Sequence, residues 1–312
     1  MENIKMRVEK RRDLTPSITE FTLVPVGDDV LPSFDPGAHI TLETPSGAMR
    51  RYSLINDGSD PKEFVVAIKK EPNSRGGSAS MHEQATVGSE LIVEFPENDF
   101  PLTDVQKYLL IAGGIGITPI LSMARYLDKK GKMLRIIYVS RSPEESAYLD
   151  ELMRDFDGRI IVHHDGGAPD AVYDFWDDLV TPRATHVFCC GPKPLMDEIK
   201  AVSGHWPEGR IHFEDFKPVD VVRQDDVSFE VELKKSGETV TVPEDRSILE
   251  ALRDAGFATS SSCESGTCGT CKTRLLEGEA DHRDMVLMEE EKSDHIMICV
   301  SRALSGRLVL DL

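Results

Sequence analysis

Three cysteines lie within nine residues near the end of the chain, in the stretch CESGTCGTC at 263–271. A fourth, Cys299, follows after 27 intervening residues, so the spacing reads C-x4-C-x2-C-x27-C. Four thiolates at this spacing are typical of a [2Fe–2S] cluster. Glycine and serine fill the rest of the loop, which lets backbone N–H groups approach the cluster sulfur atoms. The predicted ligands are Cys263, Cys268, Cys271 and Cys299.

Two other uses of cysteine remain as less favoured alternatives. A structural zinc ion usually takes two closely spaced cysteine pairs, whereas Cys299 stands alone in IMICVSRA. The remaining two of the six cysteines, Cys189 and Cys190, are adjacent, and the N-terminus has no apolar secretion segment. A disulfide framework is therefore disfavoured.

A glycine-rich turn is the second stretch that could do chemistry. In YLLIAGGIGITPILSMARYL, a predicted strand ends at Ala112 and a helix follows, with Thr118 expected as its N-cap and Pro119 as its first residue. Such a loop brings backbone amides and the positive end of the helix dipole to a phosphate group. A tight turn without a ligand uses the same residue types, so context must decide. The expected binding residues are Gly113, Gly114, Gly116, Thr118 and Pro119.

The elements around these motifs fall into three groups. Short alternating segments at 18–26, 38–47, 50–57, 63–71 and 89–95 predict an antiparallel β-barrel over residues 1–103. Apolar runs at 107–113, 134–140, 159–165 and 184–191 alternate with helical patterns at 119–131 and 146–156, which predicts an α/β domain with a parallel sheet over 104–218. A proline-containing polar linker at 219–226 leads to strands within 227–242, a helix at 247–256 and the cysteine loop, so 227–312 forms a third, α+β domain.

Two stretches of the barrel resemble the flavin site of the ferredoxin–NADP reductase superfamily. RRYSL resembles its R-x-Y-S motif, and RGGSAS resembles its flavin phosphate loop. A guanidinium suits a phosphate, an aromatic ring covers a flavin face, and a hydroxyl can hydrogen-bond to flavin N5. Each residue taken singly could equally be an ordinary barrel or surface residue. The resemblance implies flavin contacts by Arg50, Tyr52, Ser53, Leu54, Gly76, Gly77 and Ser78.

Two further stretches resemble the nicotinamide end of the same superfamily. HVFCCGPKPLMDEI carries its C-G-P motif as Cys190, Gly191 and Pro192, and the resemblance places Cys190 near the reacting nicotinamide. HFEDF resembles the segment whose aromatic ring covers the flavin, which is Phe216 here. The catalytic residues that the resemblance implies are thus Ser53, Cys190 and Phe216. The alternatives are a buried structural cysteine and a core phenylalanine.

The order of the three domains resembles the phthalate dioxygenase reductase family over essentially the full length. Residues 227–312 by themselves resemble plant-type ferredoxins with a β-grasp fold. The resemblance implies a multidomain oxidoreductase that passes electrons from NADH through FMN and the [2Fe–2S] cluster to a Rieske-type terminal oxygenase. The alternatives are an FAD-containing reductase of another hydroxylase and a non-catalytic electron carrier.

Coenzyme choice depends on the segment after the second α/β strand, VSRSPEE. Ser140 and Arg141 could hold a 2′-phosphate, whereas Glu144 and Glu145 would repel it. The family resemblance favours NADH.

The charge of the chain excludes some partners. A formal charge of -19 argues against binding to nucleic acid, which needs basic patches. No run approaches the ~20 apolar residues of a membrane span, so we expect a cytoplasmic protein without a membrane partner. The acidic stretch at 288–295 is interpreted first as a solvated face and second as a docking surface for a basic protein.

Overall fold

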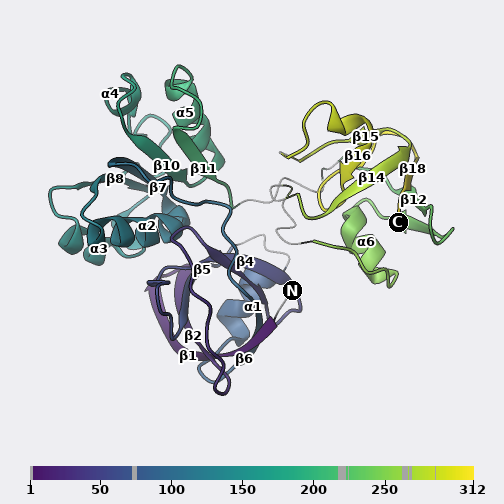
Figure 1. Cartoon of the computed structure of the whole chain (residues 1–312), viewed down its shortest axis with the longest axis horizontal. Coiled ribbons are helices and arrows are strands. Elements are labelled where there is room, and N and C mark those ends of the chain that lie inside the picture. Colours follow the sequence, from purple (N-terminus) through teal and green to yellow (C-terminus); the bar gives the residue numbers. More distant parts are fainter. Residues whose placement is uncertain are drawn as a thin grey trace. The chain divides into compact units, whose positions relative to one another are not determined.

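A computed structural model describes residues 3–71, 76–216, 223, 225–261, 266, 269–284 and 286–312. It divides into two compact units, 1–216 and 217–312 (Figure 1). The first unit contains an antiparallel and a parallel sheet, and the second contains the cysteine-rich segment. Within the described part of the chain, no helix is both long enough and apolar enough to cross a membrane.

Six antiparallel strands form the barrel. They are β1 (Asn3–Thr15), β2 (Ile18–Pro25), β3 (His39–Glu43), β4 (Met49–Ser53), β5 (Phe64–Lys69) and β6 (Glu90–Glu94), in the order β4-β3-β6-β1-β2-β5. The edge strands β4 and β5 also contact each other, which closes the sheet. Strand β1 was not predicted, because its charged residues mask an alternation in which Ile4, Met6 and Val8 point into the core. Helix α1 (Gly77–Gln84) follows β5.

Five parallel strands form the second sheet, and the apolar runs predicted all of them except β11. They are β7 (Lys107–Gly113), β8 (Met133–Ser140), β9 (Ile160–His164), β10 (His186–Cys190) and β11 (Ile211–Glu214), in the order β11-β10-β7-β8-β9. The helices of this half are α2 (Ile117–Lys129), α3 (Leu149–Asp155), α4 (Trp176–Leu179) and α5 (Lys193–Ser203), with short 3-10 turns η1 (Gly114–Gly116) and η2 (Pro143–Glu145). Helix α3 is shorter than predicted, since Tyr148 adopts a left-handed conformation (φ 61°) that stops regular helix before Leu149.

The predicted start of α2 is wrong by two residues. The N-cap is Gly116, not Thr118, and the helix begins at Ile117. The turn η1 runs directly into α2, so Thr118 already lies in its first turn, where its hydroxyl donates to the carbonyl of Ile115 (3.1 Å). Pro119 is consequently the third helical residue and not the first, and the absence of its N–H still costs no helical hydrogen bond there.

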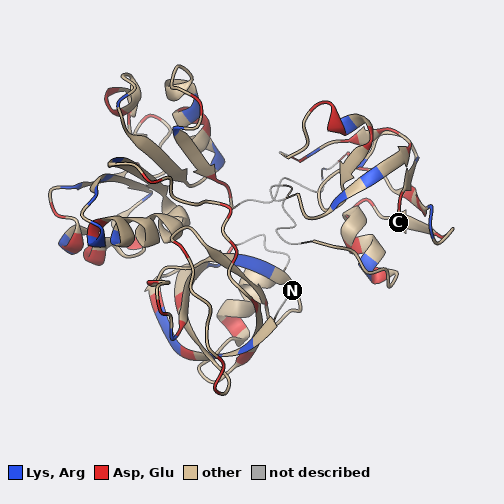
Figure 2. Ribbon diagram, in the orientation of Figure 1, with Lys and Arg blue, Asp and Glu red and all other residues tan. Residues whose placement is uncertain are grey.

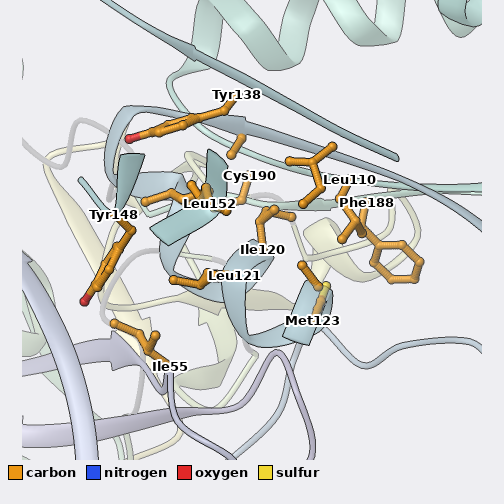
Figure 3. Close-up of a cluster of buried hydrophobic side chains, with 14 of the residues drawn as sticks. Ile55, Leu110, Ile120, Leu121, Met123, Tyr138, Tyr148, Leu152, Phe188 and Cys190 are labelled. Carbon is orange, nitrogen blue, oxygen red and sulfur yellow. The ribbon is translucent and has the colours of Figure 1, made fainter. Parts of the chain in front are cut away.

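The two sheets of the first unit share an apolar core. Ile18, Ile55 and Phe100 of the barrel half join the cluster formed by α2 and the parallel strands. Figure 3 shows Ile55 below Leu121, and Tyr148 with its hydroxyl directed toward the barrel strands. Burying apolar side chains at this junction makes the two halves one compact unit.

The second unit is a five-stranded mixed sheet with one helix, consistent with the expected β-grasp. Its strands are β12 (Phe229–Leu233), β13 (Thr239–Val242), β14 (Lys272–Glu277), β16 (His295–Met297) and β18 (Arg307–Leu310), in the order β13-β12-β18-β14-β16. β15 (Ala280–Asp281) pairs with β17 (Arg302–Ala303), and η3 (Glu291–Ser293) precedes β16. Helix α6 (Ile248–Asp254) begins at a capping box made by Ser247 and Glu250.

A buried ionic cluster lies in this second unit. Arg302 is 2% exposed and donates to the carbonyls of Val227 and Pro243, both at 3.0 Å. The Asp226 carboxylate accepts from Arg283 Nη1 at 2.8 Å and lies 3.4 Å from Arg302 Nε. Hydrogen bonding to Arg283 lowers the pKa of Asp226 to about 2. Asp226 and Val227 are thereby fixed to β17, the strand that follows Cys299.

Candidate functional site

Two of the four predicted cluster ligands lie at the same end of a strand pair. Cys271 directly precedes β14, and Cys299 follows β16. The strands are antiparallel with Lys272 opposite Met297, so their ends bring both cysteines to one place. Each is 3% exposed. Cys263 and Cys268 lie outside the described residues.

The loop between these ligands needs glycine at a defined point. Gly266 has φ +75°, and a Cβ there would lie 2.7 Å from Cγ2 of Val300, the residue after Cys299. Gly269 also has a positive φ, +83°. The close approach of Gly266 to Val300, next to the buried Cys299, fits the demands of a [2Fe–2S] cluster. The thiolates of Cys271 and Cys299 would hold iron.

The glycine loop after β7 packs against the C-G-P segment after β10. A Cβ on Gly116 would lie 2.2 Å from the carbonyl oxygen of Cys190, and one on Gly113 would lie 2.7 Å from Pro192 Cδ. Gly191 in turn approaches the backbone of Gly113, where a Cβ would be at 3.0 Å. The two sequence motifs thus form one site at the carboxyl ends of adjacent parallel strands, which is where such sheets bind nucleotides.

Cys190 lies beside a carboxylate that the sequence analysis did not single out. Parallel pairing places Cys190 of β10 opposite Glu214 of β11. Burial, together with the neighbouring Glu214 carboxyl group, raises the pKa of Cys190 well above its usual value. Burial also raises the pKa of Glu214 to about 8, and its Oε2 has no hydrogen-bond partner among the described residues. The sequence signal that could have identified Glu214 is its position as a carboxylate at the end of the strand segment IHFE.

Cys189 and Cys190 have different surroundings. Alternation along β10 directs Cys190 into the core under α2 and Cys189 into the core on the opposite face of the sheet. Burial raises the pKa of Cys189 to about 12, so this thiol is inert at neutral pH.

The barrel brings together Arg50 and Gly77, two of the residues predicted to contact the flavin. Gly77 opens α1, and a Cβ on it would lie 3.0 Å from Nε of Arg50. Gly76, the N-cap, has φ +97°, a conformation that favours glycine. Ser78 Oγ accepts from the backbone N–H of Glu71 at 3.2 Å. A guanidinium over the first turn of a helix suits a phosphate.

Tyr52 and Ser53 follow Arg50 on β4. Burial raises the pKa of Tyr52 to about 12, so its ring is neutral and apolar toward a ligand. Ser53 is 5% exposed, and its hydroxyl has no hydrogen-bond partner among the described residues. A buried hydroxyl without a partner is costly, which fits a ligand atom as the missing partner. Leu54 is a core residue.

Arg51 has a different role from Arg50. It forms an ion pair with Asp99 and lies 2.9 Å from His39 Nδ1. Arg51 lowers and Asp99 raises the pKa of Glu214, so this part of β4 lies near the carboxyl end of β11. The flavin side and the nicotinamide side of the predicted site therefore meet within the first unit.

Phe216 lies two residues after β11, at the end of the first unit, and is 40% exposed. The structure places the chain segment of Phe216 next to Glu214, but it does not place the Phe216 ring over a particular group.

The segment predicted to select between NADH and NADPH has defined side-chain contacts. Ser140 Oγ contacts Ser146 Oγ (2.6 Å) and His164 Nδ1 (2.9 Å), while Arg141 is exposed.

The acidic stretch at 288–295 is largely paired within its own unit. Glu291 forms an ion pair with Lys272, and Lys292 reaches Glu289. Figure 2 shows acidic and basic residues interspersed over both units. These pairs favour the solvated-face interpretation of the stretch.

Comparisons with known proteins cover both the cluster domain and the whole chain. The family described as 2Fe-2S iron-sulfur cluster binding domain matches residues 231–304. Phthalate dioxygenase reductase of Burkholderia cepacia is 45% identical, over 99% of this chain and 97% of that protein. The phthalate 4,5-dioxygenase oxygenase reductase subunit of Pseudomonas putida is 46% identical, over 98% and 96%.

A solved structure agrees with these sequences. It is titled phthalate dioxygenase reductase, a modular structure for electron transfer from pyridine nucleotides to [2Fe-2S], and it matches with a TM-score of 0.88 at 44% identity, over 99% of this chain and 98% of that one. The predicted resemblance, the multidomain fold, the oxidoreductase class and the [2Fe–2S] domain are thereby confirmed. The chain belongs to the phthalate dioxygenase reductase family.

Proposed function

We propose that this chain is the NADH-dependent reductase of a two-component Rieske-type oxygenase, with FMN and a [2Fe–2S] cluster as its cofactors. The flavin-binding domain comprises residues 1–103, and the nucleotide-binding domain comprises 104–218. A linker at 219–226 joins them to the cluster domain at 227–312. Its full-length relatives are reductase components of phthalate dioxygenase systems, which supports an oxygenase as electron acceptor. The proposed location is the cytoplasm.

The observation that carries the proposal is the joint site of Gly116 and Cys190. The glycine loop and the C-G-P segment touch at the carboxyl ends of β7 and β10. A pyrophosphate there meets backbone amides at the start of α2, which orients a nicotinamide toward Cys190 and Glu214. Glu144 and Glu145 are exposed after β8, and their charge opposes a 2′-phosphate, which supports NADH.

The barrel residues supply the other half of the site. Arg50 and the amides at Gly76 and Gly77 bind the flavin phosphate, and the Ser53 hydroxyl finds its hydrogen-bond partner in the isoalloxazine. Bound FMN supplies the conversion of a two-electron hydride donor into single electrons for the cluster. Glu214, with its raised pKa, holds a proton at neutral pH beside the place where hydride is exchanged.

The direct experiment is an anaerobic NADH titration of the purified protein, followed by visible absorption. We expect flavin and cluster bands that bleach together, and released flavin with the mass of FMN. A flavin that NADH does not reduce contradicts the proposal, and released FAD favours an FAD-containing reductase. A kcat/KM higher for NADPH than for NADH contradicts the coenzyme assignment.

A further inference from the structure

Four charged residues and one tyrosine join the barrel to the nucleotide-binding half. Arg12 and Glu20 are directly opposite each other on β1 and β2. Arg12 Nε and Nη2 donate to the two carboxylate oxygens of Glu20 at 3.1 and 3.0 Å. The two hydrogen bonds hold the Arg12 and Glu20 side chains in one defined geometry on the side of the barrel that faces α3.

Each member of this pair also contacts the segment around α3. Arg12 Nη1 donates to Glu151 Oε1 at 3.0 Å, and the Tyr148 hydroxyl donates to Glu20 Oε2 at 2.8 Å. The Arg12 guanidinium lies 5.7 Å from the centre of the Tyr148 ring. Arg125 of α2 completes the set by donating to Glu151 Oε2 at 2.8 Å. We call Arg12, Glu20, Arg125, Tyr148 and Glu151 the clasp.

The backbone at Tyr148 is strained. Its φ of 61° makes it the sole residue other than glycine with a positive φ among the described residues, a conformation that is unfavourable for a bulky side chain. The strain coincides with near-complete burial, since Tyr148 is 5% exposed. The left-handed turn directs the ring out of α3 and toward the barrel, as Figure 3 shows. Such strain persists only where surrounding contacts compensate for it.

Outside the clasp, an ion pair also crosses the junction: Lys129 Nζ of α2 donates to Asp57 Oδ2 at 2.7 Å, between side chains that are 66% and 56% exposed. Ion pairs this exposed fix an orientation only weakly. Ile18, Ile55 and Ala67 pack on the core under α2, and apolar packing attracts without fixing an orientation. Hydrogen bonds between charged groups do fix one, because they weaken steeply with angle. The clasp charges balance, two positive against two negative, so no uncompensated charge favours separation of the halves.

We propose that the clasp sets the orientation of the barrel on the nucleotide-binding half and so positions Ser53 relative to Cys190 for hydride transfer. This rests on the proposed function, since it concerns the same hydride step. Clasp residues are positioning residues, because they act through the geometry of the junction and touch neither cofactor. Misplacement of reacting groups by ~1 Å can slow a reaction about 100-fold, so a modest rotation has a measurable effect.

The test compares Tyr148→Phe with Tyr126→Phe in the FMN-loaded protein. The first removes only the hydroxyl that reaches Glu20, and the second alters an α2 tyrosine that is 39% exposed and outside the clasp. We expect stopped-flow reduction by NADH to slow about tenfold in Tyr148→Phe, with a larger kinetic isotope effect for 4-deuterated NADH. Tyr126→Phe should match wild type, and both variants should retain FMN.

Arg12→Gln is the second variant, because the Arg12 side chain is 51% exposed and Glu20, which is 16% exposed, keeps the Tyr148 hydroxyl as a hydrogen-bond donor. Wild-type reduction should slow as salt screens the clasp, and reduction of Arg12→Gln should be slow and less sensitive to salt than that of wild type. A readout that does not depend on activity is amide hydrogen exchange at 147–152, which should accelerate in both clasp variants of the flavin-free protein.

Reduction of both clasp variants at the wild-type rate would overturn the clasp as a positioning device, whether or not stability falls. A wild-type flavin that NADH does not reduce is a separate outcome, which overturns the proposed function instead. If Tyr148→Phe does not fold, Arg12→Gln alone decides through its rate and salt dependence.

Discussion

Glu214 lies opposite Cys190 on paired parallel strands, and the Glu214 carboxyl group contributes, after burial, to the raised pKa of the Cys190 thiol. Neither residue is charged at neutral pH in the majority of molecules, because burial raises both pKa values. The proposed nicotinamide end of the site therefore carries two protonated, uncharged groups, which suits the transfer of a hydride from a neutral dihydronicotinamide.

The raised pKa of Glu214 predicts how stability varies with pH. A carboxyl whose pKa rises from about 4.5 to about 8 on folding stabilises the folded state below pH 4.5, and this contribution is lost as pH rises toward 8. Glu214→Gln should thus reduce the fall in the free energy of unfolding between pH 5 and pH 8.5. At pH 8.5 the variant should be more stable than wild type by roughly 2 kcal/mol. Urea unfolding at pH 5, 7 and 8.5 measures these free energies, and a pH dependence equal to that of wild type contradicts the prediction.

Gly116 should not tolerate a side chain. The Cβ of Gly116→Ala would meet the Cys190 carbonyl, a backbone atom that cannot rotate away. We expect the two loops to separate, with a loss of about 1–3 kcal/mol in stability and an increase in KM for NADH of about tenfold or more. The control is Gly204→Ala after α5, where the nearest atom is 3.7 Å away. Equal KM values for the two variants argue against the shared site.

Arg50 should be needed for flavin retention. Arg50→Gln removes the guanidinium that lies against Gly77 at the start of α1, and we expect FMN affinity to fall about 10- to 100-fold. Recovery of flavin fluorescence on dilution measures the affinity. Arg7→Gln, on an exposed part of β1, is the matched control and should retain FMN as wild type does.

The cluster ligands should separate two activities. Cys299→Ser and Cys263→Ser should abolish electron transfer to cytochrome c or an oxygenase, because no cluster assembles. NADH-dependent ferricyanide reduction should persist, since the flavin half lies in the other unit. Iron content and the visible spectrum report the loss of the cluster. Loss of both activities in a variant that retains FMN shows that the order of electron carriers is wrong.

Asp226 should be essential for the second unit. Asp226→Asn leaves Arg283 and the 2%-exposed Arg302 without their buried carboxylate, which typically costs about 3–5 kcal/mol. Because its folded pKa is lowered to about 2, the wild-type contribution is present above pH 4 and is lost as pH falls toward 2. Thermal loss of the cluster absorption measures the effect. Asp225→Asn, at the neighbouring exposed position, should be neutral.

Local patterns in the sequence determined the cofactor motifs and most of the strands. The cysteine spacing predicts a [2Fe–2S] site because ligand geometry imposes it on a single loop, and the apolar runs predict parallel strands because both faces of such a sheet are buried. The glycines of the loop after β7 were identified by type. That they pack against Cys190 became visible only in the structure, since Gly116 and Cys190 are 74 residues apart.

Tertiary structure decided the roles that depend on neighbours distant in the chain. Glu214 reads as an ordinary strand residue until strand pairing places it beside Cys190, and Arg12 reads as a surface charge until the junction brings Glu151 to it. Helix α2 begins before Thr118 because η1 leads into it, although Thr–Pro is a good start signal by itself. Helix capping and ligand spacing depend on residues that are close in the sequence. The pKa of Glu214, the contacts of the clasp and the backbone conformation of Tyr148 depend on residues that only the fold brings together.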